Sequence, residues 1–426
     1  MEMFVLFSSL VILIIIGVPI GYSIGFATLL TLVTCSNVPL VLITQKAFTG
    51  VDSFPLMAIP FFILAGVLMT HGGIAKRLLD FVNVFVSGVT GSLGIVSTVS
   101  CMFFSAISGS ALATTSAIGS FMLPAMKEKD YDMGTACSIV ASAGAVGVIL
   151  PPSIPFVIYG VVTGTSIGDL FVAGIIPGVL MTVSLVIAFY IIAKQRGYKG
   201  IWEPISVKIA AEKFIKAIWA LFGPVIVLGG IYGGIFTPTE AAVIAVIYSL
   251  LVGVFVYREL NLKKIYAALL ETMVINGIIV FIVGLSVGFA VYLSLSQIPT
   301  KICAILLDIT DNKILLLLII NIFLLLIGTI VDNIPATIIL SPILLPAVMD
   351  LGMSPVQFGV ILTFNLAIGF VTPPYGQNLF VAASVAKIPV DKTYLKALPF
   401  ILALFIVLMI ITYLEGPTMF LVGLVK

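Results

Sequence analysis

Long apolar runs constrain this chain more than any other feature of its sequence. Runs close to the roughly 20 residues that a bilayer core requires occur at 4–20, 171–193, 217–236 and 314–331. The whole chain is 61% hydrophobic and only 9% charged, with a mean hydropathy of +1.30, whereas an ordinary soluble domain carries about a quarter of its residues as charges. In water, such a chain would expose more apolar surface than soluble proteins tolerate. The sequence therefore predicts a polytopic membrane protein in a lipid bilayer.

The rest of the composition argues against several other classes. The net charge is +2 and no basic cluster is interleaved with aromatic residues, so no nucleic-acid partner is expected. The N-terminus carries an acid, Glu2, where a signal peptide would be basic, which predicts a first membrane span. The four cysteines have no disulfide or zinc spacing and are interpreted as small core residues: Cys35, Cys101, Cys137 and Cys303.

Two apolar stretches, 92–126 and 313–350, are too long for one span. Each has about 35 residues, which as a single helix at about 1.5 Å per residue would overshoot a bilayer. Small or polar residues interrupt their centres, SGSALATT at 108–115 and VDNIPAT at 331–337. We therefore expect re-entrant hairpins, whose irregular backbone must be buried in protein or line a watery cavity. Other spans are predicted near 3–20, 22–36, 54–70, 134–165, 168–194, 217–236, 239–257, 265–294, 356–386 and 397–414.

Basic residues predict the orientation of the chain. The polar loop 194–216 carries six Lys and Arg residues against two Glu residues, so we place it in the cytoplasm. Counting spans from this loop puts 127–132 inside and 350–355 outside. The first 40 residues fit either one long span or two short ones.

An internal repeat joins the two hairpin regions. Residues 121–152 align without a gap on 343–374, at a constant offset of 222, with eight identical positions. These include a Leu-Pro-Ala segment and the Pro-Pro pair that ends each window. The charge count places the two copies in opposite orientations. Opposed copies of a hairpin and a broken helix predict an all-α transporter with inverted repeats.

The Pro-Pro pairs at 151–152 and 373–374 are predicted to break two helices, since proline lacks an amide donor and clashes with the preceding turn. The carbonyls of residues 147–150 and 369–372 then lose their helical partners, which is costly in hydrocarbon unless something positive takes them up. A dehydrated sodium ion would serve, and the hairpin tips can complete its oxygen shell. The helix after each break presents free amides that suit a carboxylate.

Two sets of candidate site residues follow. The predicted sodium ligands are Ser105, Ser108, Gly109, Ser110, Gly147, Pro151, Gly328, Thr329, Asp332, Asn333, Gly369, Thr372 and Pro373. The predicted substrate contacts are Thr114, Thr115, Ser153, Thr337 and Tyr375. Structural alternatives stay open: small residues also serve tight helix packing, hydroxyls also bond back to their own helix, and Asp332 could cap a helix. An ionisable residue in a membrane hairpin is nevertheless a functional hypothesis by default.

Stretches through nearly the whole chain resemble the large membrane subunit of the tripartite ATP-independent periplasmic (TRAP) transporters, in the ion-transporter superfamily. They are VDSFPLMAIPFFILAGVLM, SGSALATTSAIGSFMLPAM, GVILPPSIPFVIYG, GGIYGGIFTPTEAA, VDNIPATIILSPILLPA and GFVTPPYGQNLF. The resemblance implies an elevator-type, sodium-coupled importer in the bacterial inner membrane. It also implies a small four-helix membrane subunit and a periplasmic substrate-binding protein as partners, and a C4-dicarboxylate or sialic acid as substrate. The serine-rich tip SGSALA replaces a glycine-proline variant of many dicarboxylate members, which favours sialic acid.

The repeat and the resemblance together divide the chain into scaffold and transport regions. Scaffold spans are expected at 1–80 and 171–264, a connecting span at 265–312 and a C-terminal span at 391–426. The transport repeats are expected at 81–170, with hairpin 92–126 and broken helix 134–165, and at 313–390, with hairpin 313–350 and broken helix 356–386.

The sequence bears on two other functions. A sodium-dependent anion carrier or channel that needs no binding protein stays open, because hairpin tips also build ion pores. An intramembrane enzyme would need a nucleophile with a base, or clustered carboxylates that hold a metal. The chain has one histidine and one convincing intramembrane carboxylate, so we do not expect an enzyme.

Overall fold

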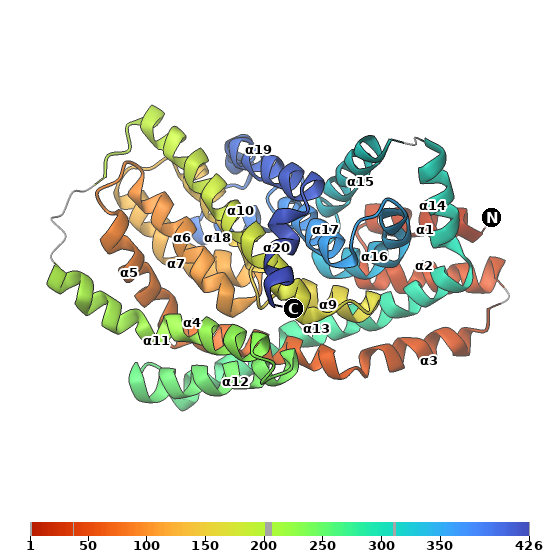
Figure 1. Ribbon diagram of the computed structural model, residues 1–426, viewed down its shortest axis with the longest axis horizontal. Coiled ribbons are helices and arrows are strands. Elements are labelled where there is room, and N and C mark those ends of the chain that lie inside the picture. Colours follow the sequence, from red (N-terminus) through yellow and green to blue (C-terminus); the bar gives the residue numbers. More distant parts are fainter. Residues whose placement is uncertain (1, 37, 201–206, 310–311, 426) are drawn as a thin grey trace.

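A computed structural model describes residues 2–36, 38–200, 207–309 and 312–425, and every regular element in these ranges is a helix (Figure 1). Seven of these helices are long and apolar enough to cross a membrane: Phe54–His71, Ile167–Arg196, Ala210–Tyr232, Pro238–Val256, Leu262–Leu295, Asn333–Asp350 and Asp391–Tyr413. The predicted all-α polytopic class is thereby confirmed.

The N-terminal region contains two short helices, α1 (Glu2–Ile15) and α2 (Ile20–Cys35). Gly17, at φ +91°, and Pro19 separate them, because neither residue continues a helix readily. A third helix, α3 (Leu40–Val51), was not predicted from the sequence. It packs along α13 (Leu262–Leu295), as Figure 1 shows.

Both long apolar stretches form two helices joined by a short tip. The first is α6 (Ser92–Ser108) and α7 (Ala111–Glu128), and the second is α15 (Lys313–Gly328) and α16 (Asn333–Asp350). Gly109 turns the first tip in the left-handed region, at φ +61°, where a side chain would be strained.

Both Pro-Pro pairs interrupt helices, as predicted. Helix α8 (Met133–Gly144) continues into a 3₁₀ turn, η2 (Ala145–Val148), and the chain becomes helical again at α9 (Ile154–Thr163). Helix α17 (Pro355–Gly369) is likewise followed by an irregular segment and α18 (Gln377–Ala386). Both Pro-Pro peptide bonds are cis.

The offset of 222 residues relates whole helices as well as residues. It carries both ends of α7 onto the ends of α16, and the start of α8 onto the start of α17. Helix contacts follow the same correspondence. Helix α7 packs on α8 and α18, while α16 packs on α17 and α9. Each hairpin therefore contacts its own broken helix and the far half of the other one.

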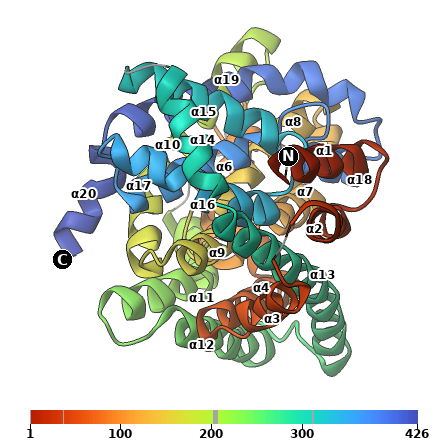
Figure 2. The same ribbon diagram turned by 90° about the vertical axis from the view of Figure 1, so that its right-hand side faces the viewer.

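The helices lie in two layers joined at both ends. The first layer holds α3, α4 (Ala58–His71), α11 (Val207–Tyr232), α12 (Pro238–Leu251) and α13 (Figures 1 and 2). The second layer holds the hairpins and broken helices with α10 (Ile167–Arg196) and α19 (Asp391–Tyr413), beside α20 (Gly416–Val425). Where one span was expected over 265–312, the structure has α13 and α14 (Ile298–Ile309). In Figure 1, α14 precedes the second hairpin as α5 (Ile74–Val86) precedes the first.

Interactions of charged and aromatic side chains hold α5 to the first layer. Asp80 pairs with Lys213 of α11 at 3.0 Å. Arg77 pairs with Glu259 at 2.7 Å and lies 3.8 Å above the ring centre of Tyr257. Helix α5 is therefore fixed to α11 and to the segment after α12.

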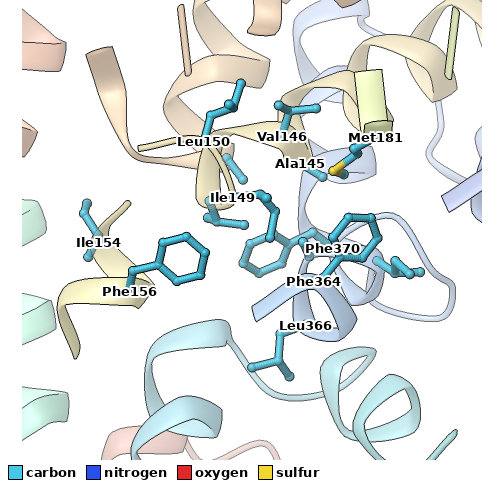
Figure 3. Close-up of a cluster of buried hydrophobic side chains, with 14 of the residues drawn as sticks. Ala145, Val146, Ile149, Leu150, Ile154, Phe156, Met181, Phe364, Leu366 and Phe370 are labelled. Carbon is cyan, nitrogen blue, oxygen red and sulfur yellow. The ribbon is translucent and has the colours of Figure 1, made fainter. Parts of the chain in front are cut away.

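The core of the second layer is apolar where the two repeats meet. Figure 3 shows Ile149 of the first break and Phe156 of α9 gathered near Phe364 and Phe370 of the second repeat. Ile149, Phe156 and Phe364 are completely buried. Apolar packing therefore joins the first break to the second repeat.

A buried amide chain distinguishes the second repeat from the first. Thr412 donates to the carbonyl of Leu408, at 2.8 Å, and accepts from Asn321, at 3.1 Å. Asn321 in turn accepts from Asn365 at 2.7 Å. These bonds tie α15 to α17 and α19, whereas Val99 and Ala143 occupy the positions that correspond to the two asparagines.

The opposite orientation that the charge pattern predicts for the two repeats can be tested by a labelling experiment. In a variant without the four native cysteines, Lys129→Cys should react with an impermeant maleimide from the cytoplasmic side. Gly352→Cys should react from the opposite side, because an odd number of membrane crossings separates inverted copies. Reaction of both positions from one side would make the two copies parallel. Labelling after permeabilisation is the control for accessibility.

Candidate functional site

The first hairpin tip lies directly on the first helix break. A Cβ atom at Gly147 would lie 2.6 Å from the carbonyl oxygen of Ser110, and one at Gly109 would lie 2.5 Å from that of Pro152. The amide of Ile154, at the start of α9, donates to the carbonyl of Gly109 at 3.4 Å. Backbone therefore meets backbone here, and only glycine permits so close an approach.

The second tip repeats this arrangement on the second break. A Cβ atom at Gly369 would overlap the carbonyl oxygen of Gly328, and one at Gly328 would lie 3.2 Å from the Cα atom of Leu366. Within the break, the amide of Asn378 donates to the carbonyl of Phe370 at 3.0 Å. The structure thus brings the predicted tip and break residues together within each repeat.

Around the first tip, several buried hydroxyl groups have no hydrogen-bond partner among the residues that the structure describes. Ser105 and Thr115 are completely buried and neither hydroxyl is bonded. Ser142 of α8, which sequence reasoning missed, has the same property. Because buried polar groups are almost always satisfied in native proteins, these oxygens fit a region that takes up a cation or water.

The other first-tip residues form a local network. Ser108 and Thr114 share a hydrogen bond of 2.8 Å, and Thr114 also lies 2.8 Å from the carbonyl of Ser110, to which it donates. The side chain of Ser110 accepts from the amide of Ala113 and so caps α7. The network fixes the tip, and each hydroxyl oxygen retains lone-pair capacity for a cation.

The second tip offers amide and hydroxyl oxygens. Asn333 is 2% exposed; its Oδ1 accepts from Thr337 at 3.0 Å, while its Nδ2 has no partner. A half-turn of this amide would present Oδ1 in place of Nδ2 and could keep a bond to Thr337, since a hydroxyl both donates and accepts. Thr329 and Thr372 donate to the carbonyls of Leu326 and Ile368, which leaves their hydroxyl oxygens able to bind a cation.

Asp332 ends the second tip and begins α16. Its Oδ1 accepts from the adjacent amide of Asn333 at 2.6 Å, whereas a helix-capping side chain usually bonds to an amide two or three residues further along. Within the described part of the chain, no Lys, Arg or His forms an ion pair with Asp332. Asp332 therefore caps the first amide of α16 in place of the usual second or third one, and its carboxylate has no side-chain counter-ion among the described residues.

The predicted substrate contacts divide into buried hydroxyls and one exposed ring. Thr114, Thr115, Ser153 and Thr337 are completely buried, whereas Tyr375 is 51% exposed. The hydroxyl of Ser153 already donates to the carbonyl of Val148, at 2.6 Å, and accepts from the amide of Phe156. The donor of that hydroxyl is occupied, so Ser153 could only accept a further bond from a substrate unless it rearranged.

The two tip-and-break units adjoin, because α9 of the first packs on α16 of the second. The sequence of their four segments, 104–115, 145–156, 326–337 and 367–379, contains no Lys, Arg or His, and its one acid is Asp332. No group of three His, Cys, Asp or Glu residues suited to a metal occurs among the described residues. The arrangement supplies hydroxyl, amide and carbonyl oxygens but no fixed positive side chain.

Comparison with known proteins decides the family. Residues 7–416 match the family described as the DctM component of the tripartite ATP-independent periplasmic transporters. The chain belongs to this family. It is a multi-pass membrane protein of the TRAP large-permease type, which confirms the resemblance found in the sequence.

Several relatives are named as transporter permeases. The chain is 45% identical, over 98% of its length, to an isethionate TRAP transporter permease named DctMQ from Oleidesulfovibrio alaskensis, of which it covers 66%. It is 38% identical to a C4-dicarboxylate large permease from Pseudomonas aeruginosa, over 92% of both chains. It is also 38% identical to a sialic acid large permease, SiaM, from Vibrio cholerae, over 93% of this chain and 92% of that one.

A solved structure shares the fold. The Alcanivorax borkumensis YdaH transporter superposes with a TM-score of 0.65, over 90% of each chain, at 16% sequence identity. At this identity, the likeness concerns the fold alone.

The tip-and-break contact predicts a strong position dependence of glycine substitutions. Gly369→Ala should destabilise the protein by about 1–3 kcal/mol, because the added methyl group overlaps backbone that cannot rotate away. Gly277→Ala is the matched control, since no atom lies within 4 Å of its added Cβ and alanine favours a helix. Thermal unfolding in detergent measures both. Equal unfolding temperatures for the two variants would contradict the contact.

Proposed function

We propose that the chain is the membrane permease of a sodium-coupled importer of small organic anions. The observation that carries this proposal is the combination of many oxygen ligands with no cationic side chain in the four tip and break segments. An anionic substrate in such a place needs positive charge from another source, because an uncompensated charge in a low-dielectric region is costly. Cations that bind and move with the substrate supply that charge.

Sodium suits the oxygens that the site offers. Hard cations bind carbonyl, hydroxyl and carboxylate oxygens, and both units combine an irregular backbone with hydroxyl groups. The unpartnered oxygens of Ser105 and Thr115 in the first unit, and the carboxylate of Asp332 in the second, support one ion region in each repeat. The starts of α9 and α18 would offer the positive ends of their helix dipoles to the substrate anion, although the amides of Ile154, Phe156 and Asn378 are already bonded within the protein.

The substrate class follows from the relatives. Their names include isethionate, C4-dicarboxylate and sialic acid, which are all small organic acids carrying a carboxylate or sulfonate group. We propose a substrate of this class for the chain, with sialic acid favoured by its serine-rich tip.

We further propose that the chain works in the bacterial inner membrane with a small membrane subunit and a periplasmic substrate-binding protein. The relative named DctMQ is longer than this chain, which covers 66% of it, as expected if a small subunit is fused there. Helices α5 and α14 connect the first layer to the second layer, which holds the hairpins. This arrangement supports an elevator movement of the second layer against the first. A carrier or channel without a binding protein is the alternative.

Uptake by proteoliposomes tests the function. With the small subunit and the binding protein present, accumulation of a labelled organic acid should require an inward sodium gradient and should rise sigmoidally with sodium concentration. Potassium in place of sodium is the control. Equal uptake in potassium medium would overturn sodium coupling, and uptake that persists without the binding protein would favour the alternative.

Asp332→Asn separates the two roles of this residue. Asparagine keeps the shape and the capping ability, because it caps about as well as aspartate, but it loses the charge. If Asp332 helps to hold sodium, half-saturation should move to higher sodium concentration, and transport should recover partly at high sodium.

An unchanged sodium dependence in this variant would leave Asp332 with its capping role alone. Asp332→Ala cannot make the distinction, since it removes the cap and the charge together.

A further inference from the structure

A polar cavity lies in the second layer, outside the candidate transport site, at the end where Lys129, Arg196 and Lys199 gather. Its volume is about 470 Å³, and it lies where four segments meet: the end of α5, the start of α6, the loop between α7 and α8, and the end of α10. A second hollow of about 620 Å³ adjoins it and shares Asp130, Tyr131, Arg196 and Tyr198. Both lie against the loops that the charge pattern places in the cytoplasm.

One wall of the cavity is held by specific contacts. The rings of Tyr131 and Tyr198 stack with their centres 4.1 Å apart, and the Tyr198 hydroxyl accepts from the amide of Asp132 at 3.0 Å. The carbonyl of Tyr198 accepts from the amide of Gly91, at the start of α6, at 2.9 Å. The cavity is therefore bounded by an ordered wall, built from residues far apart in the chain.

The side chains that line the two hollows carry more positive than negative charge. Asp132 pairs with Arg196, and Lys396 lies 3.9 Å away. Burial raises the pKa of Asp132, but hydrogen bonds from Arg196 and Thr135 outweigh it and lower that pKa below its ordinary value. The carboxylate of Asp132 therefore stays ionised and neutralises Arg196.

Apart from the paired Asp132 and Arg196, the charged residues that line the two hollows are three lysines and one acid, Asp130. Lys129 and Lys199 line the first and Lys127 lines the second, beside Asp130. None of the three lysines forms an ion pair with a residue in the described ranges. The lining of the first cavity also includes the uncharged hydrogen-bonding side chains of Asn83, Ser87 and Ser92. A phosphate group matches these donors and this charge.

The surroundings favour an amphiphile over a free anion. Phe85 and Val89 flank the lining residue Ser87 in sequence and are 57% and 40% exposed. The cavity also lies at the end of the long apolar helix α10, where a span meets the headgroup level. Basic pockets at this level, on the cytoplasmic side, are typical binding places of anionic lipid headgroups.

We propose that this cavity binds the phosphate headgroup of an anionic phospholipid. Asn83 and Ser87 belong to α5 and its end, and α5 is held to the first layer by Asp80 and Arg77. Ser92 and Tyr131 belong to the first hairpin and to the loop that follows it. A bound headgroup therefore contacts both the fixed α5 and the hairpin layer, across the link at 87–91.

Binding of short-chain lipids to the purified full chain in detergent tests this proposal without any transport measurement. Dioctanoyl phosphatidylglycerol should raise the unfolding temperature saturably. Each lysine near a phosphate contributes about a fivefold gain in affinity, so Lys129→Gln with Lys199→Gln should weaken binding about 25-fold. Lys263→Gln is the matched control: Lys263 is an exposed lysine on the predicted cytoplasmic side, at the start of α13.

Three outcomes would overturn the proposal. The double variant could bind phosphatidylglycerol as tightly as the unaltered chain. Dioctanoyl phosphatidylcholine could bind as tightly as phosphatidylglycerol, which would exclude recognition of charge. Inorganic phosphate could produce the same stabilisation at the same concentration, which would make the cavity a site for free anions. The unfolding temperature without lipid should be equal in all variants, which checks that each is folded.

Discussion

The need to satisfy backbone polar groups away from water is the constraint on which this structure depends. The chain leaves helical geometry at two tips and two breaks, and in hydrocarbon each unpaired amide or carbonyl costs several kcal/mol. The structure meets the constraint by placing each tip against a break, so that Gly147 lies against the backbone of Ser110 and Gly369 against the backbone of Gly328. The same contacts gather the oxygens that a cation needs. Fold and candidate site therefore have one physical origin.

The hairpins and breaks were predictable because their signals are local. An apolar run too long for one span, with a polar centre, and a Pro-Pro pair each occupy one short stretch of sequence. Helices α3, α5 and α14 were missed because they are shorter than a span. In α5, the charged Lys76, Arg77 and Asp80 also lower the hydropathy, although its apolar face, which includes Leu78 and Val82, is buried against the protein.

The site was predictable only where sequence and backbone geometry coincide. The predicted tip glycines lie against the breaks, with the tip hydroxyls close by, as the repeat suggests, and their role as ligands stays a prediction. Ser142 and the amide chain were missed, because Asn321 bonds with residues 44 and 91 positions away and no local pattern marks a buried asparagine. The amide chain has no counterpart at Val99 and Ala143. The two tip-and-break units therefore have similar backbones but different supporting side-chain bonds.

The tip-and-break contacts and the ion pairs of α5 differ in strength, and this difference indicates where the molecule can bend. Tip and break meet through buried backbone with no room for a methyl group, so separating them would expose polar groups and lose close packing at once. The ion pairs of α5 are partly exposed, and each contributes at most about 1 kcal/mol. The link at 87–91 contains Gly88 and Gly91, the latter at φ +74°. Any relative movement of the two layers would therefore cost least at α5 and the link 87–91, and would leave the two tip-and-break units intact.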